Sequence, residues 1–448
     1  MLGVSPNTVK MPVNGYKKGK KIMRSKKLYL AAILAITLCA CQVMKAGGPD
    51  PIFEKPAPIT MAEFKKLTFE GVRAIEVNDY MYPGYKGDIK PGAPHADLNP
   101  KKAIIIAWGD KKHQFVFCHE ASYVPLLMVP NGGGLCNQFF EAAGGELFCE
   151  PGRRERNSFV SIIESGPERA WVRWNYFCVP KTEAPPVLHG TEDYIAYPNG
   201  LIWRRLTYRS LKPDDYRAYS WQPIDFFCTI PPGVEWETIV QKDAEHGDAH
   251  VGAVLDAASD NRYDIFWGIP KPGVVHGGGY GKDKARRNGN NATLQQIAHS
   301  RLGFAMVMPF KGEMPFIILG RASGFERNQL IDQTFKDTAG YGWGAVEWDH
   351  WPIGWLNSMS NIRKPDSPYP YHIASMSHYI IEPPLKNSGE FRVRLKQDRE
   401  HSLWSERHVY YTLSGVGTDF EKIRKLSKKW LEKGKACATP DSVADLEP

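Results

Sequence analysis

The sequence predicts an all-β fold, a mostly antiparallel β-sandwich or jelly-roll-like domain, with one C-terminal helix packed on a sheet. Many short stretches are rich in Val, Ile, Tyr, Phe and Trp and alternate between two faces, as half-buried strands do. Turn clusters such as Pro198-Asn199-Gly200 separate these stretches. No helix-length pattern alternates with them, which argues against a parallel Rossmann-type sheet.

The chain begins with the features of an export signal. Its first 41 residues contain eight Lys or Arg and no Asp or Glu, and the apolar run Leu28 to Leu38 follows the basic stretch. That run is short for a membrane span and stops at Leu38-Cys39-Ala40-Cys41, the pattern of a lipobox. We expect residues 1–41 to be a signal peptide and Cys41 to carry the lipid. The protein would then be lipid-anchored in the cell envelope, on the periplasmic side or at the outer-membrane surface. A signal peptide cut nearby without lipidation is the alternative.

The basic leader accounts for the excess positive charge of the chain. Without its eight positive charges, 49 Lys and Arg remain against 49 Asp and Glu. A neutral mature chain argues against nucleic acid as a partner, because such binding depends on clustered Lys and Arg against phosphate.

The remaining elements follow in order along the chain. Residues 42–58 are predicted to be a tether, 59–436 a β-sandwich-type domain and 437–448 a tail. Thr60-Met61-Ala62-Glu63 fits a capping box, so a short helix is expected there. A long helix is predicted over 419–433, with one apolar stripe, Thr418 as its cap and Gly434 as its stop. The clearest predicted strands are 170–179, 201–208, 262–267, 304–310, 315–319, 391–395 and 409–413.

The six cysteines after the leader match no small disulfide framework and no CxxC metal pair. Cys118, Cys178 and Cys228 each follow a Phe in an apolar strand, a context that favours buried free thiols. His246 and His250 lack the HExxH order, so no metal centre is predicted. A structural Ca²⁺ ion remains open.

Two clusters carry candidate chemistry. The first runs from Phe117 to Pro125 and holds His119 and Tyr123, with Asn137 and Glu141 a short distance along the chain. An imidazole, a phenol, an amide and a carboxylate beside a flexible Gly-rich stretch can perform general acid–base catalysis. A purely structural histidine on a strand is the alternative for His119.

The second cluster is the aromatic segment 341–355, where Trp348, Asp349 and His350 are adjacent. Indole faces can stack on sugar rings while Asp and His bind hydroxyl groups, although a Trp-rich sandwich core would have the same composition. For Trp348 both interpretations remain open. Separately, Arg156 lies in a local basic patch that can neutralise a carboxylate or sulfate by forked hydrogen bonds, unless that patch is a solvated turn.

In their order, these motifs resemble a family of exported β-rich proteins similar to ulvan-type polysaccharide lyases and oligosaccharide dehydratases. The resembling stretches are Phe115 to Phe117, Ser122 to Pro125, Asn137 to Glu141, Ile162 to Glu164, Val172 to Tyr176, Glu192 to Gly200 and Asp349 to Pro352. His119 stands where the family often carries Arg, and Asn157-Ser158-Phe159 stands where it often shows Tyr-Ser-His. The resemblance implies a carbohydrate-active lineage more firmly than it implies activity.

The leading hypothesis is a polysaccharide or oligosaccharide lyase or dehydratase that acts by β-elimination on a uronate-containing glycan. Elimination removes a weakly acidic proton next to a carboxylate, so it requires a neutralising group, a base and an acid. His119 or Tyr123 is the candidate base and the other, or His350, the acid. Arg156 and Asn137 are the candidate neutralisers.

Substrate contacts are also expected from Glu141, Trp348 and Asp349, and no redox cofactor is required. The expected partners are an acidic glycan and the membrane, through the lipid. One alternative is a glycoside hydrolase with a carboxylate pair from Glu141, Glu347 and Asp349. The other is a non-catalytic surface lipoprotein that binds glycans.

Overall fold

The computed structural model groups Pro58–Pro448 into one compact unit. It describes residues 57–80, 101–119, 123–130, 134–136, 141–142, 145–146, 157–178, 186, 188–211, 220–229, 241–242, 249–267, 300–320, 327–328, 373–381 and 408–448. The predicted leader, Cys41 and most of the tether lie outside these residues, as does the predicted strand 391–395. No helix in the described ranges is long and apolar enough to cross a membrane.

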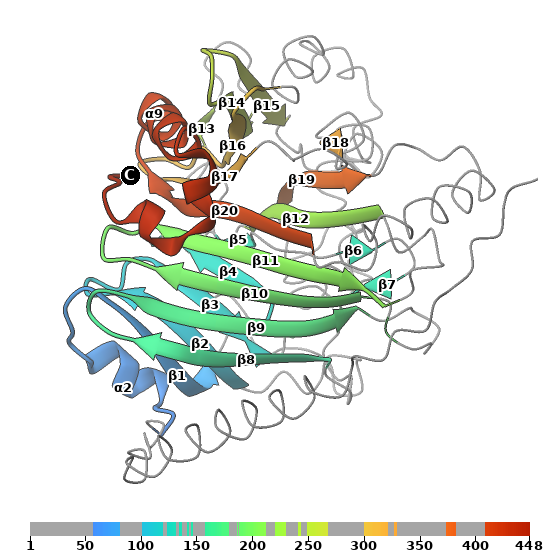
Figure 1. Cartoon of the computed structure of the whole chain (residues 1–448). Coiled ribbons are helices and arrows are strands. Elements are labelled where there is room, and N and C mark those ends of the chain that lie inside the picture. The colour runs from blue at the N-terminus through green and yellow to red at the C-terminus, as the bar shows by residue number, and fades with distance from the viewer. Residues whose placement is uncertain are drawn as a thin grey trace, which may run out of the picture. The chain divides into compact units, whose positions relative to one another are not determined.

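The strands form two antiparallel sheets, which confirms the predicted all-β class (Figure 1). The first sheet has the order β1-β2-β3-β4-β5-β12-β19-β18, with β6 beside β12 and β7 beside β6. Its strands are β1 (Val72–Tyr80), β2 (Lys101–Trp108), β3 (Gln114–Cys118), β4 (Pro125–Met128), β5 (Gly134–Cys136), β6 (Glu141–Ala142), β7 (Gly145–Glu146), β12 (Ser220–Thr229), β18 (Arg327–Asn328) and β19 (Ile373–Ile381).

The second sheet has the order β13-β14-β16-β17-β20-β11-β10-β9-β8, with β15 beside β14. Its strands are β8 (Ser158–Ser165), β9 (Ala170–Cys178), β10 (Leu188–Ala196), β11 (Ile202–Ser210), β13 (Gln241–Lys242), β14 (Ala249–Asp256), β15 (Arg262–Trp267), β16 (Gly303–Val307), β17 (Met314–Gly320) and β20 (His408–Gly417). The predicted strands at 170–179, 201–208, 262–267, 304–310, 315–319 and 409–413 correspond to β9, β11, β15, β16, β17 and β20.

Strand β9 shows why the sequence forms a half-buried sheet. Its side chains alternate strictly, so Val172, Trp174 and Tyr176 are fully buried while their neighbours are partly exposed. The buried side faces the first sheet, where the rings of Phe115 and Phe117 each lie 5.2 Å from the ring of Tyr194 on β10. The two sheets therefore pack face to face around an aromatic core.

A charged network lies inside this core. The carboxylate of Glu192 accepts hydrogen bonds from the hydroxyl groups of Tyr176 and Tyr194 and from Nε of Arg204, each at 2.6 Å. The side chains of Glu192 and Arg204 are at most 1% exposed. Burial raises the pKa of Glu192, although the Arg204 charge and the three hydrogen bonds act in the opposite direction. The additional hydrogen bonds help to offset the free-energy cost of removing the two charges from water.

The C-terminal helix α9 (Phe420–Leu431) packs on the outer face of the second sheet, as predicted. Ile423, Leu426 and Trp430 are buried against β16, β17 and β20. Thr418 is not the cap: Asp419 accepts hydrogen bonds from the backbone N–H groups of Glu421 and Lys422. A carboxylate at this position also interacts favourably with the positive end of the helix dipole. The shorter helix α2 (Met61–Lys66) begins with the predicted capping box of Thr60 and Glu63.

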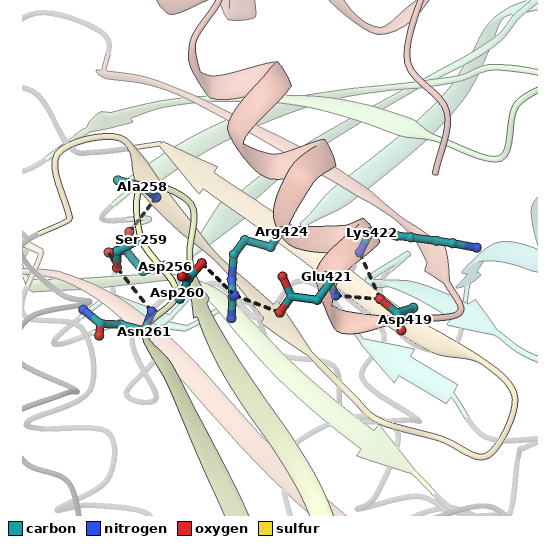
Figure 2. A network of polar contacts seen from close by, with 9 residues as sticks. All are labelled: Asp256, Ala258, Ser259, Asp260, Asn261, Asp419, Glu421, Lys422 and Arg424. Carbon is teal, nitrogen blue, oxygen red and sulfur yellow. Dashed lines mark hydrogen bonds and ion pairs between the residues drawn. The ribbon is translucent and has the colours of Figure 1, made fainter.

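Helix α9 is also tied to the turn between β14 and β15. Arg424 lies between Glu421 on its own helix and Asp260 in that turn, with Nη1–O distances of 2.8 and 3.5 Å (Figure 2). Asp256 organises the turn by accepting from the backbone N–H of Ala258 and the hydroxyl of Ser259. These contacts connect the first turns of the helix to the β14–β15 turn.

The last residues complete the core rather than extending from it. After α9 come two short 3-10 helices, η3 (Gly434–Ala438) and η4 (Pro440–Val443). Val443 and Leu446 are at most 2% exposed within the core cluster under α9. The Asn199 side chain, in the β10–β11 turn, donates to the carbonyl of Leu446 at 2.8 Å.

The prediction of buried cysteines outside disulfides is confirmed for two of the three residues, Cys118 and Cys178. Cys118 on β3 and Cys178 on β9 are buried, and within the described residues they form no disulfide. The side chain of Cys228 lies outside the description. Cys437 is a partly exposed free thiol, and its Sγ donates to the carbonyl of Trp430.

Candidate functional site

The structure describes two of the three proposed catalytic residues, His119 and Tyr123. Glu141 begins the short strand β6 opposite Gln222, but its side chain is not described. The remaining predicted site residues lie outside the described residues; they are Asn137, Arg156, Trp348, Asp349 and His350.

His119 and Tyr123 lie in the connection between β3 and β4. Strand β3 ends at Cys118, whose carbonyl accepts a hydrogen bond from the backbone N–H of Tyr123 at 2.9 Å. Strand β4 then begins at Pro125, which pairs with Phe117. The two residues are thus brought together by a turn, and they do not share one continuous strand.

Tyr123 has an unusual backbone conformation, with φ at 63°. A left-handed backbone costs free energy for a bulky side chain, and such residues concentrate at functional sites. The neighbouring Val124 is 1% exposed and Phe117 is fully buried. Buried residues therefore flank the turn on both sides.

The two side chains meet edge to face. The ring centroids of His119 and Tyr123 are 5.4 Å apart and the ring planes form an angle of 78°. Both residues are partly exposed, so a bound molecule can reach them. Histidine and tyrosine both serve as general acids and bases, and this arrangement presents one of each to the same ligand.

A second polar cluster, which sequence analysis missed, lies on the outer face of the second sheet. We call it the Asp193 cluster; its members are Trp171, Arg173, Asp193 and Arg205. One carboxylate oxygen of Asp193 accepts from Nε1 of Trp171 at 2.8 Å and from Nε of Arg173 at 2.7 Å. The other accepts from Arg205 at 2.5 Å.

Strand register explains how this cluster forms. Arg173 on β9 and Arg205 on β11 stand directly opposite Asp193 on β10, one on each side. Burial by itself would raise the pKa of Asp193, but the hydrogen bonds from Arg173, Arg205 and Trp171 outweigh it and lower the pKa. Alternation within each strand indicates which residues point outward. Only the pairing of β9, β10 and β11 shows that Arg173, Asp193 and Arg205 lie side by side.

A cavity of about 530 Å³ lies at the other end of β3, between the β2–β3 connection and the β10–β11 turn. Its lining includes Trp108, Asp110, His113 and Asn199. The indole N–H of Trp108 and the amide of Asn199 are engaged by backbone carbonyls. None of the catalytic or substrate-binding residues predicted from the sequence is among its lining residues.

The described side chains include no group of three or more His, Cys, Asp or Glu residues that could hold a metal ion. His246 and His250 were the two histidines with metal-like spacing in the sequence. Nε2 of His250 lies 2.9 Å from a carboxylate oxygen of Asp264.

No protein-family model and no curated protein matches the chain. Among solved structures, it is similar to the crystal structure of galactose 1-epimerase from Lactobacillus acidophilus NCFM, with 10% sequence identity and a TM-score of 0.32. The match covers 78% of this chain and 99% of that one. A similarity at this level identifies neither a common fold nor a common activity.

Two partly exposed chemical groupings remain. One is the proton-transfer pair of His119 and Tyr123 on the first sheet, and the other is the Asp193 cluster on the second. They differ in what they offer a ligand: the first can move protons, whereas the second presents fixed positive charge.

Proposed function

We propose that the protein acts on a uronate-containing glycan by β-elimination, with His119 and Tyr123 as its proton-transfer pair. The observation that carries this proposal is the edge-to-face contact of the two rings in a turn whose backbone is held at positive φ. Elimination needs a base and an acid near the same sugar ring, and these two side chains meet that requirement.

The reaction assigns a simple task to each group. One of the pair accepts the proton from the carbon next to the uronate carboxylate, while the other donates a proton to the departing glycosidic oxygen. The carbon–oxygen bond breaks and a carbon–carbon double bond forms in its place. In this proposal Asn137 and Arg156 neutralise the carboxylate, which lowers the cost of the negative charge that develops.

The direct test is to incubate the purified protein with a panel of uronate polysaccharides and their oligosaccharides. Ultraviolet absorbance of the new double bond and the release of reducing ends are measured together. Elimination produces both signals. Reducing ends without new absorbance would indicate a glycoside hydrolase, and neither signal alongside measurable binding would indicate a glycan-binding protein.

Variants locate the chemistry. His119→Ala and Tyr123→Phe should each lower turnover by roughly a hundredfold to ten-thousandfold, the usual contribution of general acid–base catalysis. Gln114→Ala is the matched control, because Gln114 is a partly exposed polar residue at the opposite end of the same strand. Unchanged turnover in both site variants, with wild-type thermal stability, would reject the assignment of the pair.

We also propose that the protein is anchored in the cell envelope by a lipid on Cys41. Cys41→Ser should release the protein from the membrane fraction, because acyl-chain burial is worth about 0.8 kcal/mol per methylene group. Detergent-dependent sedimentation of the variant, measured by fractionation, would contradict the lipobox.

A further inference from the structure

We propose that the Asp193 cluster is a separate binding site for a uronate carboxylate of an acidic glycan, which lies along the outer face of β9. The site binds without catalysis and lies on the other sheet from His119 and Tyr123. Only the choice of an acidic glycan as ligand depends on the function proposed above.

The cluster holds its two arginines in fixed positions. Asp193 has a side chain that is 1% exposed, whereas the side chains of Arg173 and Arg205 are 35% and 40% exposed. The negative charge therefore lies beneath the surface and the two positive charges lie above it. A guanidinium group that is already held by a buried carboxylate loses little conformational freedom when it binds a ligand.

The arginines retain hydrogen-bonding capacity for a ligand. Each guanidinium carries five N–H donors, and the hydrogen bonds to Asp193 use one nitrogen of each. Two guanidinium groups against one carboxylate leave one positive charge, which matches a single carboxylate on a sugar ring.

Neighbouring side chains on the same face suit the rest of a sugar chain. The outward residues of β9 are Trp171, Arg173, Asn175 and Phe177, all partly exposed. The Trp171 ring lies 5.4 Å from the Arg173 guanidinium, and the Phe177 ring is stacked on His189 at 4.6 Å. From Trp171 to Phe177 the strand extends about 20 Å at ~3.3 Å per residue. This length accommodates several sugar rings.

The guanidinium groups of the Asp193 cluster lie on a part of the sheet where their side chains keep 35% and 40% of their exposure. Helix α9 and the last residues cover the outer face over β16, β17 and β20. Their core cluster also includes Ile195 on β10 and Trp203 on β11, and Trp171 on β9 packs against its edge. No described helix or strand crosses the face over β8 and β9 (Figure 1). Phe159 on β8, at the edge of the same sheet, is 63% exposed. Aromatic rings beside a fixed positive charge favour an acidic sugar over a polyphosphate chain, which needs many clustered cations.

The experiment measures the affinity of the full chain for a galacturonate hexasaccharide, its neutral galactose counterpart and a sulfated galactan oligosaccharide. Arg173→Gln and Arg205→Gln should each weaken binding of the galacturonate ligand by roughly tenfold to a hundredfold and leave binding of the neutral ligand unchanged. Arg262→Gln is the matched control, because Arg262 is 42% exposed and pairs with Asp264 in the same way. Loss of sulfated-ligand affinity in place of galacturonate affinity would reassign the site to sulfate and overturn the proposal.

A second variant covers the case in which the glutamine substitutions disturb the fold. Arg205→Lys keeps the positive charge and the partner of Asp193 but removes the forked geometry, so galacturonate affinity should still fall severalfold. Unchanged affinity in the folded variants overturns this site whether or not the protein cleaves glycans. Arginine-dependent binding without any elimination product supports the site and rejects the lyase proposal alone.

Discussion

At the residue scale, Glu192 shows what a buried charge costs and what holds it in place. Its carboxylate has Tyr176, Tyr194 and Arg204 as partners and no contact with solvent. Removing one member of a buried ion pair leaves an uncompensated charge. Glu192→Gln should therefore lower the free energy of unfolding by about 3–5 kcal/mol, measured by chemical denaturation. Glu168→Gln, at an exposed position, should have little effect.

Asp193 predicts a pH dependence of stability. Its pKa in the folded protein lies below the ordinary value of 3.8. The unfolded chain therefore takes up a proton before the folded one as the pH falls, and the stability that Asp193 contributes is lost as the pH drops through the folded pKa. Asp193→Asn should be less stable than wild type at neutral pH, and the difference should shrink below about pH 4. Denaturation curves between pH 2 and 7 measure this; a difference that stays constant across the range would contradict the assignment.

Residue-level prediction from the sequence had a clear limit. The residue types of His119 and Tyr123 indicate proton-transfer chemistry, and the structure places their rings in contact. Their proximity results from a turn with φ at 63° at Tyr123, a conformation that residue type does not signal for tyrosine. Asp193, Arg173 and Arg205 are separated by 20 and 12 positions, so no local motif connected them.

At the scale of elements, the N-terminus of α9 shows which residue caps the helix. Asp419, rather than Thr418, accepts hydrogen bonds from the first N–H groups of α9. Asp419→Ala should lower stability by about 1 kcal/mol through loss of the cap, and Thr418→Ala should change it much less. Thermal and urea denaturation compare the two variants. Equal losses would mean that the cap contributes nothing specific.

Strands were predictable because alternation within a strand is a local property. The burial pattern of β9 follows the alternation in its sequence residue by residue. The order of strands was not predictable, since β20 lies between β17 and β11, which are far from it in sequence. Pairing at such distances depends on the summed packing of both sheets.

At the scale of the whole molecule, the last residues matter for stability. The sequence predicts that residues 437–448 form a tail, yet Val443 and Leu446 are buried in the core. Leu446→Ala should lower the free energy of unfolding by about 2–5 kcal/mol, the usual range for a buried leucine. Glu447→Ala alters the exposed neighbour and serves as the control. Wild-type stability of Leu446→Ala in equilibrium unfolding would show that this segment does not pack as described.

The position of β20 also sets the order of events during synthesis. This strand lies between β11, some 200 positions earlier, and β17, and it pairs with both. While the ribosome is still making the chain, the two halves of the second sheet have no strand to join them. Pairings across such separations form slowly, and unpaired strand edges attract other chains in the meantime. The second sheet therefore stays in two separate parts, with open strand edges, until almost the whole chain is available for folding.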